Sequence, residues 1–254
     1  MIEVLKTAQL FAPIDGSIQF NCTRVLFLRD GMTFCAKPPM RIGKRYKIDL
    51  DTLEDIRPIP PEPYQPLYTS DYTIASHPDR CFSKKPNLTS FMGGAELCDY
   101  VLLELATCEL IRNQPHRNIA TYHGCEVFDG RVIGLCFEKY EQTLLERVNP
   151  SHLNKKAARY LSGIEEGIRH LHSLGRNHND INPANIMFRE DDTPVITDFD
   201  SSSAPGTELD KAKRTYGWYD PDVTVSQAAN DFKALAELRT WLTGSEPAEF
   251  QFGW

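Results

Sequence analysis

The sequence predicts a mixed α+β fold, with β-rich segments first and helices concentrated later in the chain. Residues 17–28 and 32–36 alternate loosely between apolar and polar side chains, and they flank Asp30-Gly31, a dipeptide that favours a hairpin turn. Three longer segments instead repeat their apolar residues with the period of an α-helix: residues 95–112, 155–174 and 227–242. Gly175 supplies a C-terminal stop for the second of these helices.

Further short strands are expected between these helices. Two apolar runs, residues 119–127 and 132–137, flank Asp129-Gly130, which is again a strong hairpin signal. Residues 185–188 and 195–196 are two shorter strand-like runs around a turn. The alternation of hairpins and helices supports the α+β class.

Prolines mark a connector in the first third of the chain. Five of them stand within residues 57–67. Because proline fixes φ and lacks an amide donor, we expect this stretch to be extended, with neither a helix nor a central strand.

Composition narrows the classes of function. The 254 residues suffice for a sizeable core, in two domains or in one domain of two lobes, and the formal charge of −7 argues against nucleic acid or an anionic membrane as partner. The start has no signal-peptide pattern, and the longest aliphatic and aromatic run, residues 25–28, is too short to span a bilayer. We therefore expect a cytoplasmic or nuclear protein whose seven cysteines are reduced.

Oxygen-bearing side chains cluster after the second predicted helix. Residues 178–185 read H-N-D-I-N-P-A-N, and D-F-D follows at residues 198–200. Mg²⁺ prefers hard oxygen ligands, and phosphoryl transfer needs a carboxylate that orients the attacking hydroxyl. Asp180, Asn185 and Asp198 provide that set.

These motifs resemble the protein kinase family, and they stand in its order. His178 to Asp180 resembles the H-R-D of the catalytic loop, Asn185 its asparagine, and residues 198–200 the D-F-G motif. The resemblance implies that Asp180 accepts or orients the proton of the substrate hydroxyl, while Asn185 and Asp198 hold Mg²⁺ on the phosphates of ATP.

The resemblance extends upstream to an adenine site. Residues 115–124, P-H-R-N-I-A-T-Y-H-G, resemble the turn and strand after helix αC of the family, and residues 135–140, L-C-F-E-K-Y, resemble its hinge. Phe137 would then be the gatekeeper, with Glu138 and Tyr140 offering backbone groups to adenine.

A lysine–glutamate pair is implied as well. Lys84, in C-F-S-K-K-P, stands where the family has its phosphate-binding lysine, and Glu104 lies on the helix that resembles αC. Their ion pair would hold the α- and β-phosphates. Downstream, residues 215–222 resemble the end of an activation segment, and residues 230–238 resemble helix αF with its buried aspartate, Asp231.

The resemblance implies a two-lobed protein kinase-like fold, with a small β-rich N-lobe carrying one αC helix and a mainly helical C-lobe lacking the last helices. The expected organisation is as follows: a β-rich extension (1–57), a proline-rich connector and start of the N-lobe (58–78), N-lobe and hinge (79–140), and a shortened C-lobe (141–254). Whether the chain is a shortened relative of a longer kinase stays open.

Several positions depart from the family pattern. No G-x-G-x-x-G precedes Lys84, and Asn179 replaces the arginine, which makes the loop non-RD. Asn182 replaces the catalytic-loop lysine, so a slow enzyme is expected. Asp200 replaces the glycine of D-F-G, where it would bind a second Mg²⁺ or simply be solvated.

The expected function is therefore transfer of the γ-phosphoryl group of Mg·ATP to a hydroxyl, on protein Ser or Thr in preference to a small alcohol. Two alternatives remain. Small-molecule kinases of the aminoglycoside and choline phosphotransferase type share H-x-D-x-x-x-x-N and D-[FW]-[DE] and lack the glycine-rich loop. A pseudokinase would keep the fold as a binding scaffold. The sequence leaves the substrate and the oligomeric state open.

Overall fold

A computed structural model describes most of the chain, in the following ranges: 2–14, 17–30, 32–41, 49–90, 96–147, 156–210 and 212–243. The chain divides into two compact units. The first comprises Met1–Gln65 with Pro86–Cys98, and the second Pro66–Lys85 with Asp99–Trp254.

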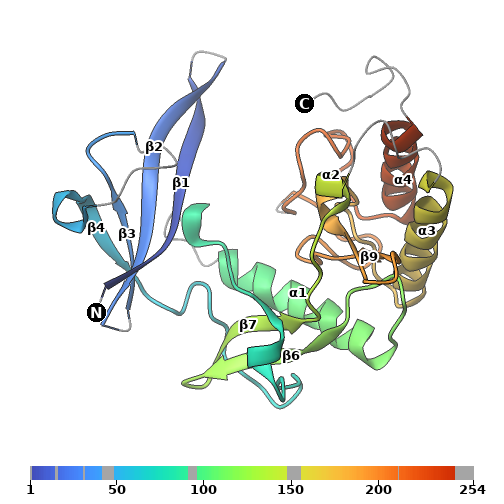
Figure 1. Cartoon of the computed structure of the whole chain (residues 1–254), viewed down its shortest axis with the longest axis horizontal. Helices are drawn as coiled ribbons and strands as arrows, with labels where there is room; N and C mark the ends of the chain where they lie inside the picture. The colour runs from blue at the N-terminus through green and yellow to red at the C-terminus, as the bar shows by residue number, and fades with distance from the viewer. Residues whose placement is uncertain are drawn as a thin grey trace. The chain divides into compact units, whose positions relative to one another are not determined.

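The first unit is built on a four-stranded antiparallel sheet in the order β1-β2-β3-β4 (Figure 1). Its strands are β1 (Ile2–Ile14), β2 (Ser17–Arg29), β3 (Met32–Lys37) and β4 (Glu54–Ile59). The predicted hairpin of β2 and β3 is confirmed, and Asp30 at its turn has a φ of 51°. Strand β1, which pairs with β2 over most of its length, was not predicted.

Both faces of this sheet are covered by apolar residues of the same unit. Because neighbouring residues of a strand point to opposite faces, Val25 and Phe27 join one buried cluster and Leu26 joins another with Ile59 and Tyr64. Two short 3-10 helices, η1 (Leu50–Thr52) and η3 (Leu88–Ser90), belong to the same unit.

The proline-rich stretch begins inside strand β4. Pro58 pairs with Phe34 of β3, and β4 is the last strand of the sheet order. Proline is tolerated on an edge strand because its missing donor faces away from the ladder. The expectation of no helix and no central strand holds here, although residues 57–59 do form an edge strand.

The second unit opens with a three-stranded sheet in the order β5-β7-β6, followed along the chain by helices. Its strands are β5 (Phe82–Lys84), β6 (Tyr122–Phe128) and β7 (Arg131–Phe137). Helix α1 (Glu96–Asn113) runs between β5 and β6, as its apolar period predicts, and the 3-10 helix η2 (Pro78–Arg80) precedes β5. The hairpin turn at Asp129 and Gly130 has φ angles of 49° and 70°, and the predicted hairpin is confirmed.

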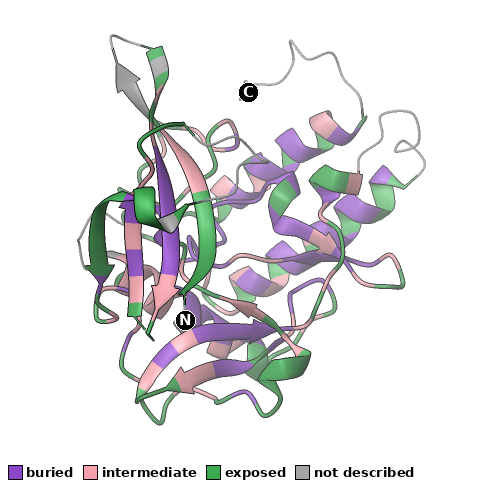
Figure 2. Cartoon of the chain, turned by 60° about the vertical axis from the view of Figure 1, so that its left-hand side comes forward, coloured by how far each residue is buried: buried purple, intermediate pink, exposed green. Residues whose placement is uncertain are grey.

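The remaining elements hold the loop that carries the polar motifs. They are α2 (Leu144–Arg147), α3 (Ala157–Ser173), the 3-10 helix η4 (Pro183–Asn185), β8 (Ile186–Phe188), β9 (Pro194–Ile196) and α4 (Ala228–Thr243). The amphipathic helix α3 packs its buried face against α4 and β9 (Figure 2). Gly167 allows the close approach to β9, since a Cβ there would lie 2.9 Å from Cδ1 of Ile196 and 2.8 Å from the carbonyl oxygen of Asn118.

Helix α3 ends as its sequence predicts. Gly175 takes a φ of 73°, and the amide of Arg176 donates to the carbonyl of Leu171. Among the helices that the structure describes, none is long and apolar enough to cross a membrane.

Candidate active site

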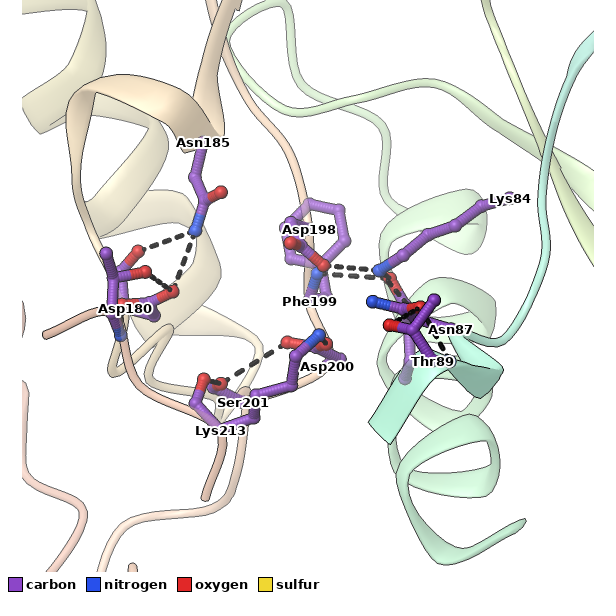
Figure 3. A network of polar contacts seen from close by, with 12 residues as sticks. Lys84, Asn87, Thr89, Asp180, Asn185, Asp198, Phe199, Asp200, Ser201 and Lys213 are labelled. Atoms are coloured by element: carbon purple, nitrogen blue, oxygen red, sulfur yellow. Dashed lines mark hydrogen bonds and ion pairs between the residues drawn. The ribbon is translucent and has the colours of Figure 1, made fainter. Parts of the chain in front are cut away.

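A partly buried ion pair joins the three-stranded sheet to helix α1. Lys84 Nζ on β5 lies 2.6 Å and 2.8 Å from the two carboxylate oxygens of Glu104 on α1, and it also contacts Asp198 (Figure 3). The Glu104 carboxylate accepts a further hydrogen bond from the amide of Phe199, at 3.2 Å. The structure therefore brings together the lysine, the glutamate and the D-F-D aspartate that the sequence singled out.

The charges of these groups depend on one another. Desolvation opposes the charge of Lys84, but the carboxylates of Glu104, Asp198 and Asp200 outweigh it and raise the lysine pKa. Burial raises the pKa of Glu104, and Lys84 offsets only part of that rise. Burial also acts to raise the pKa of Asp198, yet the neighbouring Lys84 holds it below its ordinary value. Lys84 is therefore a fixed positive charge between two carboxylates.

Asp180 lies in the loop between α3 and η4, and both of its carboxylate oxygens accept hydrogen bonds. Oδ1 accepts from the amide of Thr215 at 2.8 Å, and Oδ2 accepts from the Thr215 hydroxyl at 2.9 Å and from Asn185 Nδ2 at 3.0 Å. Burial raises the pKa of Asp180, while the Thr215 donors act in the opposite direction. These contacts fix the orientation of a carboxylate that is suited to accept a proton from a hydroxyl.

Helix α4 holds this loop through Asp231. Its carboxylate accepts hydrogen bonds from the backbone amides of His178 and Asn179, at 2.8 Å and 2.7 Å, and lies 2.8 Å from the ring Nε2 of His172. Asn179 takes a φ of 64°, and the two amides donate to the two oxygens of one carboxylate. His178 is fully buried, with Nε2 3.0 Å from the Thr197 carbonyl. His178 is therefore placed as a structural residue of the loop.

The side-chain oxygens of Asn185 and Asp198 are suitable ligands for a divalent cation. Asn185 directs its Nδ2 toward Asp180, and Figure 3 shows its amide oxygen turned toward the side where Asp198 lies. Asp198 itself takes a φ of 64° and leaves about a third of its side chain exposed. An amide oxygen and a carboxylate are suitable Mg²⁺ ligands. Within the described residues, His, Cys, Asp and Glu side chains alone form no group of three that could hold a metal ion.

The third residue of D-F-D is already paired. Asp200 Oδ2 lies 2.9 Å from Lys213 Nζ, and Asp200 Oδ1 accepts a hydrogen bond from Ser201 at 3.3 Å. The expected role of Asp200 as a metal ligand stays a prediction, and any metal there would compete with Lys213.

The residues predicted to form the hinge take part in a separate network of hydrogen bonds and one ion pair. Phe137 is buried at the end of β7, and the amide of Glu138 donates to the Thr121 carbonyl at 2.9 Å. The Glu138 carboxylate contacts Arg189 and accepts from the hydroxyls of Thr121 and Tyr140. The backbone amide of Glu138 is therefore already engaged within the protein. The assignment of an adenine site to these residues stays a prediction.

Sequence reasoning missed three residues of this site. Thr215, Lys213 and Arg189 contact Asp180, Asp200 and Glu138, from which they are separated by 35, 13 and 51 residues. The sequence places Thr215 at the end of an activation-like segment, but no local pattern assigns it a partner.

Comparison of the sequence with known protein families identifies the family to which this chain belongs. A family model for the protein kinase domain matches residues 95–235, more than half of the chain. The chain therefore belongs to the protein kinase domain family, and the predicted family and α+β fold class are confirmed.

Curated relatives are similar over shorter stretches. A probable cell division protein kinase of Encephalitozoon cuniculi is 27% identical over 127 residues, 48% of this chain and 39% of the relative. Serine/threonine-protein kinase Tao of Drosophila melanogaster is 26% identical over 143 residues, 55% of this chain and 13% of the relative. Human serine/threonine-protein kinase H1 is 30% identical over 123 residues, 46% of this chain and 27% of the relative. The chain thus spans well under half the length of each of these relatives.

Proposed function

We propose that this chain is an ATP- and Mg²⁺-dependent phosphotransferase of the protein kinase type, acting on protein Ser or Thr. The observation that carries the proposal is the contact of Lys84 with both Glu104 and Asp198. A lysine held between two carboxylates is suited to contact phosphate oxygens, and a carboxylate beside it is suited to hold a divalent metal ion. The relatives' names support a protein hydroxyl as acceptor.

Each residue has a chemical role in this proposal. Lys84 would bind the α- and β-phosphates, with Glu104 positioning it. Asn185 and Asp198 would hold Mg²⁺, which would supply positive charge beside the phosphates. Asp180 orients the substrate hydroxyl and accepts its proton. Because these side chains are fixed by contacts within one unit, the catalytic groups need little rearrangement.

Turnover is expected to be slow. Asn182 stands where the family has a lysine, and it donates instead to the Thr215 hydroxyl and the Asp180 carbonyl, each at 3.1 Å. A missing positive charge beside the transferring phosphoryl group costs several kcal/mol of transition-state stabilisation in a dry site.

Product analysis tests the proposal. With γ-labelled ATP and Mg²⁺, we expect label on Ser or Thr of a degenerate peptide library and none on a panel of aminoglycosides, choline and ethanolamine. Label on a small alcohol alone would replace the proposal with the small-molecule kinase alternative. Nucleotide binding without transfer to any acceptor would favour the scaffold.

A further inference from the structure

The connection between Lys84 and Glu104 belongs to the first unit, although both of these residues belong to the second. The two residues are 20 positions apart in the sequence, and residues 86–98 lie between them. Helix α1 crosses the boundary, because its first residues are part of the first unit and the part that carries Glu104 begins at Asp99. The first unit therefore contains the chain that links the two members of the ion pair.

The beginning of this connection contacts one face of the four-stranded sheet. The 3-10 helix η3 contacts strands β1 and β2. Arg24 on β2 is buried, and its Nη1 donates to the Thr89 carbonyl at 2.8 Å. Leu88 packs in a cluster with Leu26, which follows Arg24 by two residues and therefore points to the same face. A hydrogen bond and an apolar contact from one face of β2 thus fix η3.

Asn87 shapes the chain directly before η3. Its Oδ1 accepts hydrogen bonds from the amide and the hydroxyl of Thr89, at 3.2 Å and 2.8 Å (Figure 3). Lys6 Nζ donates to the same oxygen at 3.4 Å. Lys6 on β1 pairs with Leu26, so its side chain lies on the same face of the sheet as Arg24. Asn87 is exposed, which makes it suitable for a mild substitution.

The end of the connection packs against the same cluster. Leu97, in the first turn of α1, packs against the cluster formed by Leu26, Ile59, Tyr64 and Leu88. Both ends of the connection are therefore held by one set of residues on the sheet. The entropic cost of closing a loop grows with its length, and each doubling of the length disfavours closure about threefold.

We propose that the first unit positions the Lys84–Glu104 ion pair by holding both ends of the connection between the two residues. This inference rests on the proposed function, in which the pair binds the phosphates of the nucleotide. Packing of Leu88 and Leu97 on one cluster shortens the loop that the ion pair has to close, so it favours the formed pair. Arg24 and Leu88 are positioning residues that act on the pair through the chain.

Nucleotide affinity in matched variants tests the inference without turnover. The full chain is titrated with a non-hydrolysable ATP analogue in the presence of Mg²⁺, and binding is measured by calorimetry. We expect Kd to rise about threefold for Leu88→Ala and for Arg24→Ala, since each variant releases the beginning of the connection and roughly doubles the loop. Arg24→Lys keeps a charged donor and should raise Kd less than Arg24→Ala does.

Val25→Ala is the matched control. Val25 stands between Arg24 and Leu26 on β2, but it is buried in the cluster on the opposite face of the sheet. Because Val25→Ala and Leu88→Ala each truncate a buried aliphatic side chain of the same unit, both should lower the urea midpoint of unfolding. We expect Kd to stay unchanged in Val25→Ala, whereas a merely structural effect would change Kd in both variants.

The outcomes separate the inference from the proposed function. An unchanged Kd in a folded Leu88→Ala or Arg24→Ala variant, or an equal rise in Val25→Ala, would overturn the inference and leave the proposed function standing. A wild type that binds no nucleotide would overturn the proposed function, and the inference with it. Circular dichroism checks the fold of each variant. If neither Leu88→Ala nor Arg24→Ala folds, Asn87→Ala decides, because a rise in its Kd is expected and an unchanged Kd would overturn the inference.

Discussion

Asp180→Ala is expected to lower kcat by about 10³-fold while leaving the affinity for nucleotide nearly unchanged. The reason is that, of the phosphate-binding and metal-binding groups proposed here, Asp180 contacts only Asn185, and its own role is to take the proton of the substrate hydroxyl. Steady-state kinetics with a peptide substrate, together with nucleotide titration, separates the two effects. Asp222→Ala serves as control, because Asp222 is an exposed carboxylate of the same unit.

The pH dependence gives a second readout of the same residue. Because burial raises the pKa of Asp180, its ionised, proton-accepting form is lost at a higher pH than for an exposed aspartate. The wild-type kcat/KM should therefore fall at acid pH with a midpoint above 3.8, the ordinary value for this group. Activity of Asp180→Ala within tenfold of wild type, with the acid limb retained, would show that another group is the base.

Asp231→Ala is expected to lower the free energy of unfolding by about 4 kcal/mol. The Asp231 side chain is only 1% exposed and contacts two backbone amides and the His172 ring. Its removal therefore leaves two buried amides without an acceptor and the partly buried His172 ring without its partner. The affected amides belong to His178 and Asn179, directly before Asp180. Urea denaturation, monitored by circular dichroism, measures the decrease in the free energy of unfolding. The value of kcat should fall in parallel because the catalytic loop loses its fixed position.

A matched carboxylate separates this effect from simple loss of charge. Asp220→Ala removes an ion pair with Lys233 that is partly exposed, and should cost under about 1 kcal/mol. Asp231→Asn keeps one acceptor oxygen and should fall between the two. A loss below about 1 kcal/mol for Asp231→Ala would mean that water or another group satisfies the loop amides, and that Asp231 does not hold the catalytic loop.

The sequence predicted those parts of the fold that depend on local signals. Asp-Gly turns, the apolar period of α1, α3 and α4, and the stop at Gly175 all act within a few residues, and the structure agrees with them. Strand β1 was not predicted because its register with β2 shifts between Val4 and Lys6 and again between Leu10 and Phe11. Such irregularities break the two-residue alternation by which a strand is predicted.

The site was predictable to the extent that its residues stand in motifs of fixed spacing. Asp180, Asn185 and Asp198 could be singled out in this way, whereas Lys84 and Glu104 were implied by the resemblance to the protein kinase family. The structure shows which of these residues touch. The partners Thr215, Lys213 and Arg189 could not, because ion pairs and hydrogen bonds between distant segments leave no periodic trace in the sequence. Their detection required the fold.

The central claim, a metal-dependent nucleotide site that includes Asp198, is tested most directly by thermal unfolding with ATP, with Mg²⁺ and with both. At ligand concentrations about 100 times Kd, binding should stabilise the wild type by about 2.7 kcal/mol. We expect this shift only when ATP and Mg²⁺ are present together, and we expect Asp198→Asn to lose its Mg²⁺-dependent part. No shift for the wild type under any condition, or an undiminished Mg²⁺-dependent shift for Asp198→Asn, would contradict the account.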